Sequence, residues 1–222
     1  MLAGGRGLGT FTNGFHGGVH VVTRARQAAD ISSRMLGQHL ITKQTGAEGR
    51  RCDKVFIVER LYLRREMYLS IMLDRSAAGP ILIASSRGGT SIEDVAATTP
   101  DLIHQEVIDI MAGGLTDAQV ERVIEALGVS GRAADAAKET IRNLYRMFRA
   151  TDATLIEVNP LAETPDGKIV VADAKINFDD NAAFRQSDIF AKRDYSQEDA
   201  REVEASKWDL NYIGLDGNIG CV

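Results

Sequence analysis

The sequence contains few of the features that mark disulfide-rich, metal–thiolate or membrane-spanning proteins. Only two cysteines, Cys52 and Cys221, occur in 222 residues, and their separation matches no metal-ligand spacing. This composition favours a reducing compartment. No apolar run approaches the ~20 residues that a transmembrane helix requires, so we expect no membrane partner.

An excess of positive charge and a catalytic nucleophile motif are also absent from the sequence. The formal net charge is −5, which gives no general attraction to nucleic acid. None of the four histidines lies at a triad-like or metal-like spacing, and no serine or cysteine nucleophile motif occurs. We therefore expect no self-contained hydrolase and no catalytic residue of that kind. The apolar content of 44% and the charged content of 26% are ordinary for a globular protein, so a packed core is expected.

The most informative stretch is a hairpin near residue 160. Two β-rich runs, 154–161 and 168–175, flank the polar turn 165–167. A three-residue loop closed by a glycine bulge would pair Thr164 with Lys168 and would place Asn159 opposite Asp173 on one face. A two-residue loop would separate the two side chains, because a slip of one residue turns a strand over.

Asn159 and Asp173 together offer an amide oxygen and a carboxylate. Hard oxygen ligands of this kind suit Mg²⁺, which completes its shell with water and phosphate. Glu157 shares a strand face with Asn159, and Lys175 lies close by in the hairpin, as in a metal–phosphate site. The alternative is a surface hairpin with polar strand ends and an ordinary ion pair.

Two further groups are candidate nucleotide ligands. At the glycine-rich start, Gly5 and Gly7 let a ligand approach the backbone N–H groups closely, and Arg6 adds a fixed positive charge. This combination suits a phosphate chain. The pattern is neither G-x-G-x-x-G nor a P-loop, so both common nucleotide folds are disfavoured. Glu59 and Glu66 end and begin two expected strands, where a carboxylate can accept from a ribose hydroxyl. The alternatives are a flexible loop and a charged turn with surface ion pairs worth ~0–1 kcal/mol each, and spacing alone favours the charged turn.

Periodicity and capping patterns outline an α+β protein, with strands followed by helices and then strands again. The expected strands outside the hairpin are 19–23, 54–60, 66–74 and 80–85. The expected helices are 24–37, a short one after Ser91, one opened by the Thr116–Gln119 capping box, and 131–150.

Seven segments resemble, in register, the β subunit of succinate–CoA ligase. They are LAGGRG (2–7), TKQTG (42–46), DRS (74–76), GGTSIEDVA (88–96), IEVNP (156–160), DAKINFDDNA (173–182) and YIGLDGNIGC (212–221). The resemblance implies an ATP-grasp fold, in which two α+β lobes hold a nucleotide. The resemblance covers only the ATP-grasp part of the family's β subunit. We expect this domain at 1–210, and we expect 211–222 to begin a C-terminal CoA-ligase-type domain. The chain is therefore expected to be truncated at both ends.

The resemblance also implies an activity, an acid–thiol ligase of the tricarboxylic acid cycle. Succinyl-CoA, ADP and phosphate would be interconverted with succinate, CoA and ATP, and a partner α subunit would bind CoA and carry the phosphorylated histidine. Gly5, Arg6, Gly7, Glu59 and Glu66 match the family's nucleotide ligands, and Asn159 and Asp173 match its Mg²⁺ ligands. A mitochondrial matrix location follows from the eukaryotic likeness.

The sequence departs from the family pattern at several points. We expect the family's lysine-bearing segment before the glycine loop and its succinate-handling domain to be missing, and Leu8 stands where bacterial relatives commonly have lysine. We therefore expect little catalysis from this chain alone. Segments 43–46, 64–66 and 196–199 resemble the ADP-forming plant type. The alternatives are a GDP-forming subunit, a malate- or citrate-type acid–CoA ligase, and a non-catalytic interaction module.

Overall fold

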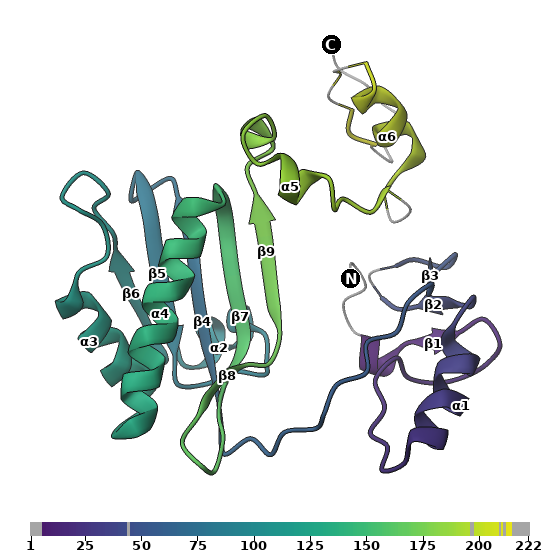
Figure 1. Cartoon of the computed structure of the whole chain (residues 1–222), viewed down its shortest axis with the longest axis horizontal. Coiled ribbons are helices and arrows are strands. Elements are labelled where there is room, and N and C mark those ends of the chain that lie inside the picture. Colours follow the sequence, from purple (N-terminus) through teal and green to yellow (C-terminus); the bar gives the residue numbers. More distant parts are fainter. Residues whose placement is uncertain (1–5, 44, 196–197, 209, 211, 215–222) are drawn as a thin grey trace. The chain divides into compact units, whose positions relative to one another are not determined.

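The chain divides into two compact units in the computed structural model, which describes residues 6–43, 45–195, 198–208, 210 and 212–214 (Figure 1). The terminal unit comprises Met1–Arg60 and Arg193–Val222, and the central unit comprises Leu61–Lys192. Both units contain helices and strands, as the expected α+β class requires. Among the described residues, no helix combines the length and apolarity needed to cross a bilayer.

The terminal unit contains a small antiparallel sheet of order β1-β2-β3. Its elements are η1 (Arg6–Leu8), β1 (Thr10–Phe11), α1 (Ala25–Met35), β2 (His39–Ile41), β3 (Arg50–Arg51) and α6 (Ala200–Ser206). The expected helix at 24–37 is confirmed as α1, after which Gly37 takes a φ of +76°. Phe11, Met35 and Leu40 form the buried apolar cluster of this unit.

The central unit is built on a six-stranded antiparallel sheet. Its strands run in the order β6-β5-β4-β7-β8, and β9 also pairs with β7. The strands are β4 (Arg65–Asp74), β5 (Gly79–Ser85), β6 (Ile103–Val107), β7 (Ala153–Glu163), β8 (Ile169–Val171) and β9 (Ala174–Phe178). The helices are α2 (Ile92–Thr98), η2 (Pro100–Leu102), α3 (Asp117–Leu127), α4 (Arg132–Ala150), η3 (Asp180–Ala182) and α5 (Ser187–Phe190).

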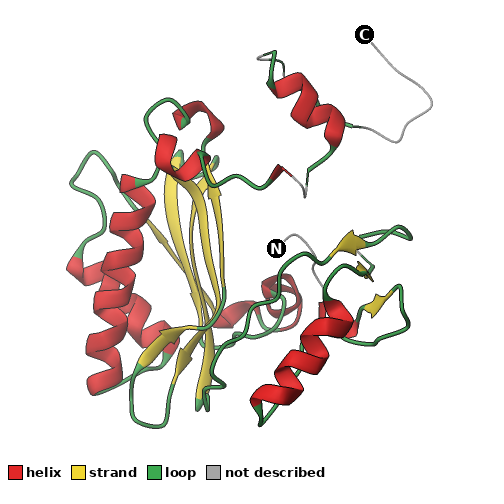
Figure 2. Ribbon diagram, turned by 45° about the vertical axis from the view of Figure 1, so that its right-hand side comes forward, coloured by secondary structure: helices red, strands yellow, loops and turns green. Residues whose placement is uncertain are grey.

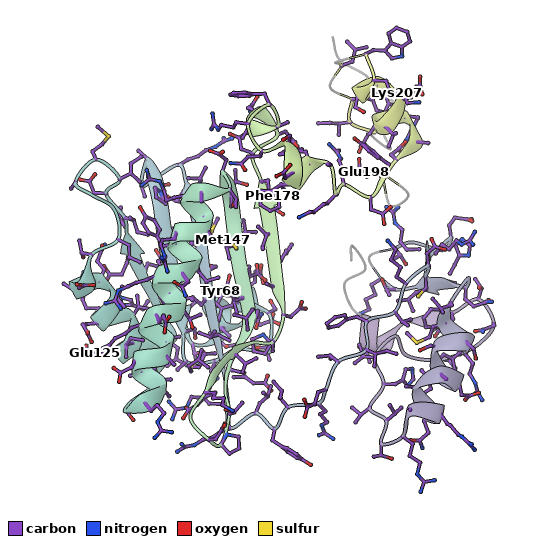
Figure 3. All side chains as sticks on the ribbon, in the orientation of Figure 1. Tyr68, Glu125, Met147, Phe178, Glu198 and Lys207 are labelled. Atoms are coloured by element: carbon purple, nitrogen blue, oxygen red, sulfur yellow. The ribbon has the colours of Figure 1, made fainter. Side chains whose placement is uncertain are left out.

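Helices α3 and α4 lie together on one face of this sheet (Figure 2). The expected capping box opens α3, where the Thr116 hydroxyl accepts from the Gln119 N–H, and Gly128 ends the helix in a left-handed conformation. The apolar stripes of both helices pack on alternate residues of the strands, including Leu69, Ile156 and Val158. Met147 of α4 and Phe178 of β9 join this core (Figure 3). The main hydrophobic core therefore lies between the helices and one face of the sheet.

Two strand predictions are wrong. Residues 19–23 and 54–60 have no regular secondary structure. Phe56, Ile57 and Val58 are 83%, 67% and 67% exposed, so the apolar run that predicted the second strand is not buried. A β-rich run becomes a strand only where another strand pairs with it, and neither segment joins a ladder within the described residues. Residues 215–222 lie outside the described part, and the boundary at 210 stays a prediction.

Candidate nucleotide and metal site

The turn of the β7–β8 hairpin has the predicted geometry. The Thr164 N–H donates to the Lys168 carbonyl at 3.0 Å, and the Gly167 N–H donates to the Thr164 carbonyl at 2.9 Å. Gly167 takes a φ of +77°, in the left-handed region that favours glycine. The three-residue loop predicted from Pro165–Asp166–Gly167 is confirmed, and with it the register of the hairpin.

This register places Asn159 opposite Asp173. The Asn159 N–H donates to the Asp173 carbonyl at 3.2 Å. Val158 pairs with Ala174 on one side, and Leu161 pairs with Val171 on the other, in the same register. Asp173 lies between β8 and β9, and the pair joins the two ladders without a change of register. The structure therefore brings these two predicted ligands together.

Asn159 projects from the face of the sheet that lies opposite α3 and α4. Ile156 and Val158 pack into the helix-covered core, so Glu157 and Asn159 alternate to the other face. On that face Glu157 stands between two cross-strand partners, Ser70 of β4 and Lys175 of β9. We call this face, with its polar residues, the site face.

The amide of Asn159 is held by the loop 88–90. Its Oδ1 accepts from the Gly89 N–H at 2.7 Å, and its Nδ2 donates to the Thr90 carbonyl at 2.8 Å. Reversing the amide would set donor against donor and acceptor against acceptor, so the direction of Oδ1 is determined. A carbonyl oxygen has two lone pairs, and the bond to Gly89 uses one of them.

Asp173 provides the second oxygen group. Its side chain is exposed, and its Oδ1 accepts from the Ala174 N–H at 3.0 Å. The donor set of Asn159 and Asp173 is entirely oxygen, which fits the hard cation Mg²⁺ with its one or two protein ligands. No group of three or more His, Cys, Asp or Glu side chains suited to a metal occurs among the described residues. The pair therefore fits Mg²⁺ better than a metal that needs a complete protein cage.

Polar and charged groups near the site face shift one another's pKa values. The Ser91 hydroxyl donates to Glu93 Oε2 at 2.6 Å and lowers the pKa of that carboxyl, with a smaller contribution from Lys175. Burial raises the pKa of Tyr68, and the charges of Glu157 and Glu93 raise it further. These groups from α2 and three strands are therefore within electrostatic reach of one another.

Glu66 also belongs to this neighbourhood. Its carbonyl accepts from the Gly88 N–H at 2.9 Å, and its carboxylate lies against Gly89, where it leaves no room for a β-carbon. The same loop therefore contacts Glu66 and Asn159, two residues predicted for different parts of the site.

The remaining predicted ligands belong to the terminal unit. Gly5 lies outside the described residues, and Arg6 and Gly7 form part of η1. Glu59 lies in the irregular segment that replaces an expected strand. Their grouping with Glu66, Asn159 and Asp173 stays a prediction.

Sequence reasoning missed the contact between the loop 88–90 and Asn159. The Gly88–Gly89 pair indicated a turn, and Ser91 indicated the helix that follows. Nothing in the sequence indicated that the loop meets a residue 70 positions further on. Ser70 and Tyr68 were also missed, because both lie in an apolar run that reads as ordinary strand.

The fold and the matched sequence define the class of protein. The ATP-grasp domain family matches residues 1–163, which is most of the chain. The chain therefore belongs to the ATP-grasp family, and the fold predicted from the resemblance is confirmed.

Comparison with individual proteins is more specific. The chain is 57% identical over 222 residues to the mitochondrial β subunit of ADP-forming succinate–CoA ligase of Solanum lycopersicum, and covers 53% of it. It is 55% identical to the corresponding Arabidopsis thaliana subunit, covering 52%. It is 51% identical to a GDP-forming β subunit of Dictyostelium discoideum, also covering 52%. The chain is matched over 99–100% of its length, and spans about half the length of these relatives.

Solved structures support the fold. An ATP citrate lyase from Methanothrix soehngenii matches 83% of this chain and 42% of its own, with a TM-score of 0.61 and 18% identity. At this identity the likeness concerns the architecture alone.

Proposed function

We propose that this chain is the nucleotide-binding part of a succinate–CoA ligase β subunit. The observation that carries the proposal is the pairing of Asn159 with Asp173 on the site face, in a chain at least 50% identical to such subunits over 222 residues. The reaction interconverts succinyl-CoA, ADP and phosphate with succinate, CoA and ATP. An α-type subunit supplies the CoA site and the phosphorylated histidine, and the mitochondrial relatives favour a matrix location.

In this proposal, Asn159 and Asp173 hold Mg²⁺. When bound between these two residues, the ion would supply positive charge to neutralise phosphate oxygens. Asn159 presents Oδ1 in a direction determined by Gly89 and Thr90, and Asp173 adds a negative charge beside it. Lys175, at the edge of the same face, offers a positive charge to phosphate.

The nucleotide itself is proposed to bind through the ligands that the sequence predicted. Gly5, Gly7 and Arg6 contact its phosphates through backbone N–H groups and the guanidinium, and Glu59 and Glu66 accept hydrogen bonds within its pocket. Phosphoryl transfer depends mainly on positioning and charge neutralisation, so these binding groups suffice on this side of the reaction. The nucleophile comes from the partner, and no histidine of this chain has a catalytic role.

Isothermal titration with Mg-ADP tests the proposal. Wild-type chain should release or take up heat on binding, and Asp173→Ala should weaken the affinity by about tenfold or more, which corresponds to ~1.4 kcal/mol. Asp135→Ala is the matched control, since it removes an exposed carboxylate from α4, on the other side of the sheet. Equal affinities of the wild type and Asp173→Ala would contradict the metal assignment.

The GDP-forming alternative is kept because one relative of that type is 51% identical. The same titration with Mg-GDP separates the two, and tighter binding of Mg-ADP is the expected result. If neither nucleotide binds and an α-type subunit still co-purifies, an interaction module is favoured instead.

A further inference from the structure

The loop 88–90 contacts two parts of the proposed site through its backbone. Its Gly89 N–H and Thr90 carbonyl hold the two ends of the Asn159 amide, at 2.7 Å and 2.8 Å. At its start, the Gly88 N–H donates to the Glu66 carbonyl at 2.9 Å. The loop therefore joins a proposed nucleotide ligand on β4 to a proposed metal ligand on β7.

Gly88 is required by a close backbone contact, and Gly89 is favoured by its backbone conformation. A β-carbon on Gly88 would meet the Met67 backbone, and one on Gly89 would meet the Glu66 carboxylate. Gly89 also has a φ of +73°, which side chains other than glycine rarely adopt. A larger residue at position 89 would therefore displace Glu66, the loop, or both.

From these contacts we propose that the loop 88–90 is a positioning element for the metal–nucleotide site. It directs Asn159 Oδ1 toward the cation and keeps the Glu66 carboxylate in place, with Gly89 as the positioning residue. The inference rests on the proposed function, and it deepens it by assigning a role to residues that make no proposed contact with the ligands. The ligand class is a divalent cation with a nucleoside diphosphate.

The Asn159→Asp substitution tests whether the loop positions residue 159, because Mg²⁺ affinity should change differently with and without that role. The substitution keeps an oxygen for the cation and adds a negative charge, but it replaces the donor that faces the Thr90 carbonyl with an acceptor. If the loop positions residue 159, Mg²⁺ affinity falls by about 10- to 100-fold, the usual cost of losing such support. If the loop has no such role, the added carboxylate leaves the affinity equal or raises it. Calorimetric titration with MgCl₂ in the presence of ADP, and Mn²⁺ binding followed by EPR, give the affinities.

Gly89→Ala and Gly37→Ala form a matched pair. Both place a side chain at a left-handed position, but only Gly89 has a neighbour that the new β-carbon would meet. We expect Gly89→Ala to weaken Mn²⁺ and Mg-ADP binding by about tenfold or more, while Gly37→Ala, at the end of α1, binds as the wild type does. Wild-type affinity in Gly89→Ala would overturn the inference.

Amide hydrogen exchange at Gly89 tests the loop without any ligand. In the wild type the Asn159 oxygen protects this N–H, so Asn159→Ala should speed its exchange by about tenfold or more. Unchanged exchange would overturn the inference even if the wild type binds Mg-ADP. Faster exchange in Asn159→Ala, with no Mg-ADP binding by the wild type, would instead contradict the proposed function.

Discussion

The two faces of the central sheet are built from the same strands but differ in chemistry. The face under α3 and α4 presents apolar side chains such as Leu69, Leu82 and Val158, all fully buried. The site face presents Ser70, Glu157 and Asn159 from the alternate positions of two of these strands. Since side chains alternate along a strand, one run of residues can build the core on one face and a polar site on the other. Stability and binding should therefore be separable by substitutions at adjacent positions.

The largest expected effect on stability separates Leu69 from Ser70, two adjacent residues whose side chains lie on opposite faces. Leu69→Ala should lower the free energy of unfolding by about 2–5 kcal/mol, because it opens a cavity in the core. Ser70→Ala should leave it unchanged or raise it. The Ser70 hydroxyl is buried next to Tyr68 but makes no hydrogen bond of ordinary geometry with the described residues. Urea denaturation measures the free energy of unfolding of both variants. A similar decrease in the two would contradict the difference between the two faces.

The next effect concerns a buried carboxylate on the helix-covered side. Arg122 donates to Glu106 at 2.6 Å and 2.8 Å, and His104 also bonds to it. These contacts, that from Arg122 first, lower the pKa of Glu106 to about 2. Because the pKa is lower in the folded state, the stabilisation is present above about pH 4.5 and is lost as the pH falls toward 2.

Glu106→Gln should therefore flatten the decline of stability over that acid range, as thermal unfolding at a series of pH values would reveal. Glu125→Gln is its control, since it removes an exposed carboxylate from the helix that carries Arg122. A steep decline that persists in Glu106→Gln would assign the acid sensitivity to other groups.

A smaller effect is expected at the start of α3. Thr116→Ala removes the hydroxyl that accepts from the Gln119 N–H, and should cost about 1 kcal/mol. The site face should not respond, so Mg-ADP affinity should stay at the wild-type value. Chemical denaturation and calorimetry on the same sample give both quantities, and a loss of affinity would show that the faces are coupled.

The smallest effect on stability is expected at Lys175, on the site face. Lys175→Ala should change the free energy of unfolding by less than about 0.5 kcal/mol, since the side chain is exposed. Mg-ADP binding should weaken several-fold and become less sensitive to salt, because the proposed phosphate site loses a positive charge. Lys192→Ala, another exposed lysine of the central unit, should alter neither quantity.

Prediction from sequence succeeded where the deciding interactions are local. The turn at Pro165–Gly167 determines the hairpin register, and so the pairing of Asn159 with Asp173, within a few residues. Capping residues such as Thr116 and Ser91 marked helix starts for the same reason. The ATP-grasp assignment came from the family resemblance and is confirmed by the matched family.

Prediction failed where a distant partner decides the outcome. The runs at 19–23 and 54–60 have strand-like composition but no ladder within the described residues, whereas β6, which was not predicted, pairs with β5. Pairing depends on which segments meet in the folded chain, and composition does not encode that choice directly.

The sequence by itself determined the helices α1, α3 and α4, the hairpin register, and the placing of Asn159 opposite Asp173. Each follows from spacings of a few residues, over which backbone geometry is nearly independent of the rest of the chain. Only the tertiary structure decided that this face lies opposite the helices, and that the loop 88–90 holds the Asn159 amide and lies against Glu66. These contacts join residues far apart in the chain, so they exist only once the strands of the central sheet have paired.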